Sequence, residues 1–187
     1  VVVQVGGEWL MFYAGDSGAL TSIGRATSAD GLTWQRDQEA AYVASLDWEI
    51  GVAVPGSVQV LSDGTLRLWY STAAPDTDGN DSRIAALDST DGGVTWALVP
   101  GVAYAWQLDA DAPATWNDSG VKDPFVLSDG ELDRMWFSGF DGDVWQLGYA
   151  ERKVGKTAWT VSSDFEGTPR AILLAATGSI GAGGVSR

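Results

Sequence analysis

Short runs in which apolar and polar residues alternate occur along the whole chain. The clearest runs are residues 9–15, 66–71 and 134–139, and each is built around Trp, Tyr, Phe or Met. Alternation with a period of two residues is typical of a β-strand with one buried face, and aromatic residues favour that conformation. Asp-Gly and Gly-Gly steps between the runs favour tight turns. The pattern therefore predicts an all-β protein of short strands.

The alternating runs belong to a longer internal repeat. Tyr13, Tyr70 and Phe137 occupy equivalent places in it. A Gly-Val segment precedes the run at residues 51–55 and 120–124, and its start recurs at 184–187. A segment that ends in Trp follows the run, at residues 23–34, 84–96 and, in diverged form, 147–159. Units of four short strands that repeat in this way are typical of β-propeller blades.

The repeat divides the chain into about three blades of a β-propeller, each a four-stranded antiparallel sheet. The expected blades are residues 1–37, 52–98 and 121–162, with the first strand of a further blade at 183–187, all within one segment, 1–187. Three blades in a row leave an apolar face uncovered at each end. We therefore expect that further blades exist outside this sequence, or that copies of the chain associate as a homo-oligomer.

Composition narrows the chemistry that the chain can carry. The chain has ten Trp, a hydrophobic share of 45% and a net charge of −14, but no Cys and no His. Thiolate nucleophiles, Ser-His-Asp triads and histidine zinc sites are thereby excluded, which leaves carboxylates, Tyr and Lys for acid–base chemistry. A sequence pI near 4.1 argues against nucleic acid and anionic membranes as partners. Neutral sugars and cations remain acceptable ligands.

The repeated motifs resemble those of the five-bladed propeller glycosidases, which include the arabinanase and β-xylosidase family, the invertases and the β-mannoside phosphorylases. The likeness rests on Asp-Pro at 123–124, on the Trp-Tyr and Met-Trp-Phe strands, and on the Ile-to-Trp segments at 23–34 and 84–96. Residues 89–96 also resemble the Asp-box of sialidases, in which Ser and Asp bond to the turn backbone. The resemblance implies carbohydrate as partner, an extracellular or secreted protein, and a five-bladed parent.

Two carboxylates are the candidate catalytic groups of a glycoside hydrolase or phosphorylase. Asp123 matches the inner-strand Asp-Pro of the family, and Glu49 lies in the connection before the second blade. Glycoside cleavage by carboxylates needs two such groups at a defined separation. The equivalents of Asp123 in the second and fourth blades are expected to be Val54 and Arg187, which cannot serve as carboxylates. Glu49 has a structural alternative, because residues 116–120 hold a similar place one blade later.

Aromatic residues supply the candidate sugar-binding positions, since pyranose faces pack on aromatic rings. Six Trp lie in the repeated strands and turns and are expected in the core: Trp9, Trp34, Trp69, Trp96, Trp136 and Trp159. The other four fall in or beside connections and are candidate substrate-binding residues, together with Arg187: Trp48, Trp106, Trp116 and Trp145. We expect no cofactor and no metal. The acidic residues 76–81 resemble a Ca²⁺ loop in composition only, and a solvated loop is the alternative.

Three functions are compatible with the sequence. In the first, the chain is part of a glycoside hydrolase or phosphorylase whose other blades supply the missing carboxylates. In the second, it is part of a carbohydrate-binding propeller that has lost those carboxylates. The third possibility is a blade fragment that completes itself by oligomerisation without a retained ligand. A fold alone does not choose among them.

Overall fold

The computed structural model describes residues 1–46, 48–73, 82–99, 120–140 and 142–161. These residues form twelve strands and no helix. None of the described segments is a helix long and apolar enough to cross a membrane. The all-β prediction is therefore confirmed for the described part of the chain, and the expected strand at 183–187 lies outside it.

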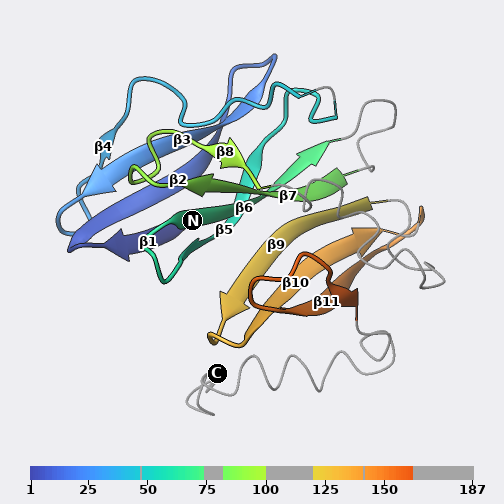
Figure 1. Ribbon diagram of the computed structural model, residues 1–187. Coiled ribbons are helices and arrows are strands. Elements are labelled where there is room, and N and C mark those ends of the chain that lie inside the picture. The colour runs from blue at the N-terminus through green and yellow to red at the C-terminus, as the bar shows by residue number, and fades with distance from the viewer. Residues whose placement is uncertain (47, 74–81, 100–119, 141, 162–187) are drawn as a thin grey trace, which may run out of the picture.

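The strands form three separate four-stranded antiparallel sheets, and in each sheet neighbours in the chain are neighbours in space (Figure 1). The first sheet contains β1 (Val2–Val5), β2 (Glu8–Asp16), β3 (Thr21–Ser28) and β4 (Gln35–Arg36). The second contains β5 (Val54–Val60), β6 (Leu66–Ala73), β7 (Ser82–Ser89) and β8 (Ala97–Leu98). The third contains β9 (Gly120–Ser128), β10 (Leu132–Phe140), β11 (Trp145–Lys153) and β12 (Thr160–Val161). Each sheet is one blade, and the chain contains about three.

Strand register defines which residues of the three blades are equivalent. Phe12 pairs with Arg25, Trp69 with Ala86, and Trp136 with Tyr149, each between the second and third strands of a blade. Cross-strand partners point to the same face of a sheet, and next-but-one residues along a strand do so too. Phe12, Trp69 and Trp136 therefore occupy the same position on successive blades and face in the direction of the following blade.

Two hydrophobic cores fill the spaces between the blades. The core between blades one and two contains Leu10, Phe12, Ile23, Ala44, Ala53, Leu66, Leu68, Tyr70, Ala85 and Leu87. The core between blades two and three contains Trp69, Ile84, Ala86, Val121, Val126, Met135, Phe137, Ala150 and Trp159. Each core draws on both facing sheets, so neither end blade would bury its apolar face without its neighbour.

The prediction that six Trp belong to the core holds fully for two of them. Trp69 and Trp159 are 1% and 6% exposed, whereas Trp9, Trp34, Trp96 and Trp136 are only partly buried. Trp9 and Trp136 lie on the outward faces of the first and third blades, where no other described blade covers them. The repeat predicts which positions are apolar, and the place of a blade in the row decides whether they are buried.

The turn before β8 is held by side-chain oxygens. Asp91 Oδ1 accepts hydrogen bonds from the backbone N–H of Val94 and Thr95, both at 3.0 Å, and Ser89 Oγ accepts one from Gly93 at 2.9 Å. The Thr95 hydroxyl, and then the Thr95 N–H and the Ser89 hydroxyl, donate to the ionised carboxylate and hold the pKa of Asp91 below its ordinary value. Gly93 has φ 81° and lies against the Phe12 ring, so a side chain there would displace blade one. The turn thus contributes to the contact between blades.

The inner strands of blades two and three touch where both are bulged. A Cβ on Gly56 would lie 2.5 Å from the carbonyl oxygen of Pro124, so only Gly fits at that point. The N–H of Val126 donates to Ser57 Oγ at 3.1 Å. This contact fixes the start of β9, which carries Asp123, against the second blade.

Candidate functional site

Asp123 lies in the β-bulge of the innermost strand of blade three. The register of β9 against β10 is interrupted opposite Phe137, which leaves Asp123 and Pro124 facing a single residue. The Asp123 N–H donates to Ser71 Oγ of blade two at 2.8 Å, and the Ser138 hydroxyl donates to Asp123 Oδ2 at 3.2 Å. The residue is exposed to solvent. The fold therefore presents this carboxylate at the junction of two blades.

The backbone of Asp123 is held in the left-handed region, with φ 56°. Among residues other than Gly, Asp and Asn adopt this region most readily, although at a cost in free energy. Such strained residues persist only where the surroundings fix them, and they cluster at functional sites. An exposed, strained Asp whose N–H and carboxylate are both hydrogen-bonded is the strongest candidate functional group in the described residues.

Register corrects the expected equivalence between Asp123 and Val54. Val54 pairs with Ser71 and Lys122 with Ser138, so Val54 is equivalent to Lys122. Asp123 is then level with Pro55, one residue later. The shift follows from the bulges, because the repeated Pro falls at the first position of the bulge in blade two and at the second in blade three. Pro cannot adopt a positive φ, so blade two cannot form the same site.

The Trp145 ring contacts Lys122, the residue that precedes Asp123 in β9. The Lys122 ammonium nitrogen is 3.9 Å from the centroid of the Trp145 ring, within the range of a cation–π contact. Phe140 stacks on the same indole, with ring centroids 4.8 Å apart and planes at 24°. Phe140 and Trp145 are paired next to the turn of the β10–β11 hairpin. Four residues of this region were not among the candidates predicted from the sequence: Lys122, Phe140, Ser71 and Ser138. Lys122 could have been found, because it is adjacent to Asp123 in the sequence.

Glu49, the second predicted catalytic residue, is fully enclosed, with 0% exposure. The Tyr42 and Tyr70 hydroxyls each donate to its Oε1 at 2.6 Å. The N–H groups of Ser45 and Leu46 donate to Oε2 at 2.8 and 2.9 Å. These four donors come from the connection 40–51 and from β6, so the carboxylate ties the connection to blade two. The geometry favours the structural alternative for Glu49, and its catalytic role stays a prediction.

The two tyrosines that bind Glu49 are held in their neutral form. Burial, and then the hydrogen bond to the Glu49 carboxylate, raise the pKa of both Tyr42 and Tyr70 above the ordinary value of 10. Each hydroxyl is therefore a hydrogen-bond donor throughout the physiological pH range.

This network predicts a loss of stability at alkaline pH. Above pH 10 the unfolded chain releases the two phenolic protons while the folded chain retains them, so the unfolded state binds fewer protons and the free energy of unfolding falls. The stabilisation is complete below pH 10 and declines as pH rises through the folded-state pKa values. Urea unfolding between pH 8 and 11 measures the slope. In a Tyr42→Phe/Tyr70→Phe variant, which lacks both protons, the slope should be shallower. An unchanged slope would contradict this assignment.

The remaining sequence-derived candidates are distributed as follows. Trp48 is partly buried and packs against the core between blades one and two. Trp106, Trp116, Arg187 and the acidic segment 76–81 lie outside the described residues. Within the described ranges, no three carboxylates come together in a group that could hold a metal ion. Of the candidates in the described part of the chain, Trp145 contacts Lys122, the residue next to Asp123.

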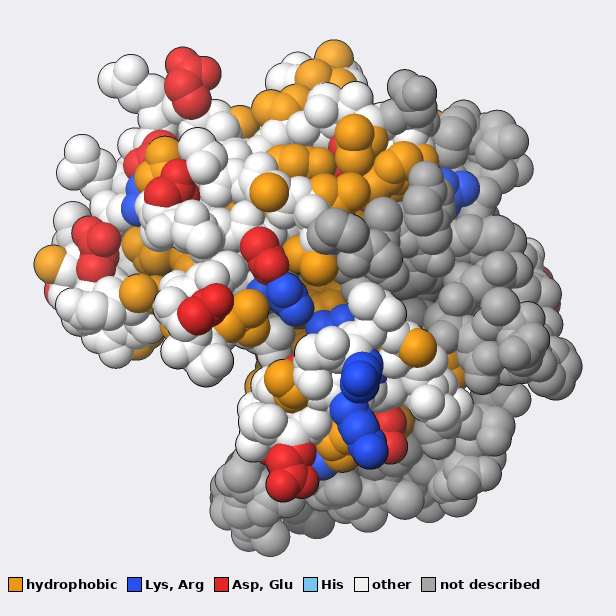
Figure 2. Space-filling view, in the orientation of Figure 1, with side chains coloured by type: hydrophobic (Ala, Val, Ile, Leu, Met, Phe, Trp, Pro, Cys, Tyr) orange, Lys and Arg blue, Asp and Glu red, His pale blue; other side chains and the backbone are white. Residues whose placement is uncertain are grey.

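A separate hollow lies on blade one. It has a volume of about 530 Å³ and is lined by the ends of β2 and β4, the start of β3 and the residues after β4. Its charged lining residues include Asp16, Arg36, Asp37 and Glu39. Figure 2 shows several acidic side chains over the surface of this first sheet. Asp123 does not line the hollow. An acidic hollow on an outward blade face is a weaker candidate than the strained carboxylate at the blade junction.

Comparison with known proteins places this geometry in a structural context. No family model and no curated sequence matches the chain. Among solved structures, a fructan 1-exohydrolase from Cichorium intybus aligns over 84% of this chain and 30% of its own, with TM-score 0.62 and 15% identity. A GH32 β-fructofuranosidase from Bombyx mori aligns over 86% of this chain and 33% of its own, with TM-score 0.64 and 16% identity.

A third structure, a glycoside hydrolase described as putative from Parabacteroides distasonis, aligns over 89% of this chain and 50% of its own, with TM-score 0.64 and 17% identity. The chain has the fold of part of a propeller glycoside hydrolase. The propeller segment spans between 30% and 55% of the length of the structures matched. Structural likeness at this level of identity concerns the fold, and the activity of the propeller has to be argued from its own residues.

Proposed function

We propose that this propeller segment binds carbohydrate at the Asp123 surface, as part of a glycoside-hydrolase-type protein. The observation that carries the proposal is the exposed Asp123 carboxylate, held at φ 56° at the junction of blades two and three. An ionised carboxylate accepts hydrogen bonds from sugar hydroxyls, and charge-assisted bonds of this kind are stronger than neutral ones. The chain's net charge of −14 is compatible with a neutral sugar.

The neighbours of Asp123 supply the other interactions that a sugar needs. The Lys122 ammonium, on the residue next to Asp123, offers a hydrogen-bond donor, and the partly buried Trp145 indole, which contacts both that ammonium and Phe140, adds apolar surface. Ser138 orients the carboxylate through its hydroxyl. A polar acceptor, a donor and an aromatic surface within one strand-end cluster form a small, oriented binding site.

Glycoside hydrolysis is the second candidate function, and it is favoured by the hydrolase structures that share the fold. In that reaction Asp123 would be one of the two carboxylates, acting as base, nucleophile or orienter of the acid. The partner has to lie roughly 5–5.5 Å away for retention or 6.5–9.5 Å away for inversion. Glu49 is enclosed by four donors. The second carboxylate would therefore be a residue other than Glu49.

A binding panel with matched variants tests the proposal. The ligands are sucrose, 1-kestose, arabino-oligosaccharides and xylo-oligosaccharides, with affinity from calorimetry and hydrolysis from reducing-sugar release. Asp123→Asn should weaken the tightest ligand by about tenfold or more, since a hydrogen bond to a charged group contributes roughly 1.5–3 kcal/mol. Glu131→Gln removes an exposed carboxylate at the far end of the same blade and should change nothing.

The outcomes separate the two candidate functions. Binding that depends on Asp123 without turnover supports carbohydrate recognition alone, and turnover lost in Asp123→Asn supports hydrolysis. Equal affinities in wild type and Asp123→Asn, with both proteins folded, would overturn the assignment of this surface.

A further inference from the structure

The same aromatic contact joins both pairs of adjacent blades. Phe12 of blade one meets Trp96 of blade two edge to face, with ring centroids 5.2 Å apart and planes at 81°. Trp69 of blade two meets Trp159 of blade three in the same way, at 5.6 Å and 76°. In each pair the first ring comes from the second strand of a blade. The second ring comes from the Trp directly before the fourth strand of the next blade.

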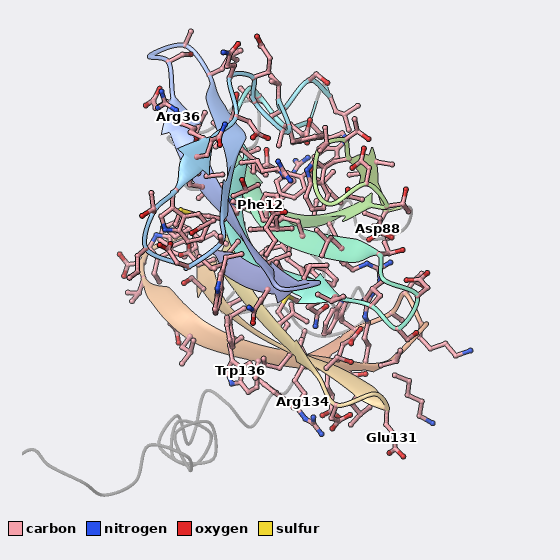
Figure 3. The ribbon with its side chains drawn as sticks, turned by 90° about the vertical axis from the view of Figure 1, so that its left-hand side faces the viewer. Phe12, Arg36, Asp88, Glu131, Arg134 and Trp136 are labelled. Carbon is pink, nitrogen blue, oxygen red and sulfur yellow. The ribbon has the colours of Figure 1, made fainter. Side chains whose placement is uncertain are left out.

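Among the residues that the structure describes, each half of this contact occurs once more without its counterpart. By register, Trp136 of blade three is the equivalent of Phe12 and Trp69. Trp34, directly before β4, is the equivalent of Trp96 and Trp159. Figure 3 shows Phe12 between two sheets, whereas Trp136 lies on the side of the third sheet turned away from the other two.

The outward face of blade three is apolar around Trp136. Its indole lies 6.3 Å from the Phe125 ring and 5.4 Å from the Tyr149 ring, measured between centroids. Phe125 is 50% exposed, Leu127 is 51% exposed and Leu147 is 41% exposed. This "following face" has the composition of the surfaces that form the two cores inside the chain.

The outward face of blade one is the other half of the interface. It carries Trp9, Met11 and Tyr13, which are equivalent by register to Leu66, Leu68 and Tyr70 in the core between blades one and two. Val2 on the same face is 46% exposed. We call this surface the "leading face". Each end of the row thus presents a different half of one repeated interface.

We infer that the following face of one chain binds the leading face of a second copy, with Trp136 against Trp34 in the edge-to-face contact seen twice within the chain. Complementarity identifies the occupant, because the surface that fits a following face is a leading face, and the described residues of this chain include one. The interface is heterologous, since it joins two different patches, so copies add head to tail and stop only where a ring closes.

Salt dependence follows from the charge of the chain. Two copies that each carry −14 repel one another, and salt screens that repulsion over a Debye length of about 10 Å at 0.1 M. Self-association through the apolar faces should therefore strengthen as sodium chloride rises from 0.05 to 0.5 M. An interface held by surface ion pairs would weaken instead.

Sedimentation velocity on the 187-residue chain and its face variants tests the inference. The wild type should form multimers, and Trp34→Glu or Trp136→Glu alone should each weaken association by about thirtyfold or more, as expected for a central aromatic anchor. Mixing the two variants should restore one heterodimer, because each variant keeps the face that the other lacks. Val94→Glu, on an exposed turn of blade two, is the matched control and should associate like wild type.

Two experimental outcomes would contradict the proposed association between copies. A wild-type chain that stays monomeric at 0.5 M salt and high concentration would overturn it, whether the faces are covered by another part of the protein or remain bare. A Trp34→Glu variant that still associates fully would indicate a symmetric contact between following faces. Circular dichroism verifies folding, and Val2→Glu and Leu127→Glu, at exposed positions on the two faces, replace any variant that unfolds.

Discussion

Glu49→Ala is expected to lower the free energy of unfolding by about 3–5 kcal/mol, because removal of a buried charged partner leaves its donors unsatisfied. Two tyrosine hydroxyls and two backbone N–H groups would lose their acceptor, a carboxylate that is itself fully buried. The loss is a large share of the roughly 5–15 kcal/mol that stabilises a typical domain. Urea unfolding followed by tryptophan fluorescence measures it.

The control for this variant is Glu39→Ala, an exposed carboxylate that precedes the same connection. It should change the free energy of unfolding by less than about 0.5 kcal/mol. Equal stabilities of Glu49→Ala and Glu39→Ala would contradict the structural role. A Glu49→Gln variant that keeps its stability but loses glycoside turnover would instead support the catalytic role predicted from the sequence.

Arg152→Met is expected to cost about 3–5 kcal/mol of stability, because it leaves the Asp133 carboxylate buried without its partner. The Arg152 Nε lies 2.9 Å from Asp133 Oδ2, and the two side chains are 4% and 9% exposed. The guanidinium carbon also lies 5.0 Å from the Trp69 centroid and 4.5 Å from that of Trp159, so it packs on the rings that join blades two and three. A Met side chain at position 152 keeps most of that packing.

Blade two has neutral residues at the two positions that form this ion pair in blade three. Asp133 pairs with Arg152 in blade three, and Leu66 pairs with Ser89 at the same register in blade two. The double variant Asp133→Leu/Arg152→Met should therefore recover most of the stability that Arg152→Met loses. A double variant as unstable as the single one would mean that packing on Trp69 and Trp159, not the orphaned carboxylate, causes the loss.

The fold was predictable because most of the residues that define the repeat form strands and turns through interactions with their sequence neighbours. Alternating apolar residues and Gly turns reflect contacts within a blade, and they recur in each blade together with the Trp before the fourth strand. The incomplete burial of Trp9 and Trp136 was not predictable from these local interactions. It depends on whether another blade packs against the face that carries each Trp.

The candidate site was predictable only in part. Asp123 was found through its motif, but its positive φ results from a bulge whose register depends on contacts with blade two. The enclosure of Glu49 depends on Tyr42 and Tyr70, which are far apart in the sequence and meet only when the connection folds onto β6. The contact of Lys122 with Trp145 likewise joins two strands that are not neighbours in the sheet.

The most direct test of the central claim, that the Asp123 surface binds carbohydrate, is an NMR titration of the ¹⁵N-labelled chain with the tightest sugar of the panel. The Trp145 indole N–H and the Asp123 backbone N–H signals should shift, while that of the Trp69 indole N–H, which donates to Gln59 inside the blade, should stay in place. No shifts, or shifts confined to the acidic hollow around Asp16 and Asp37 on blade one, would contradict the claim.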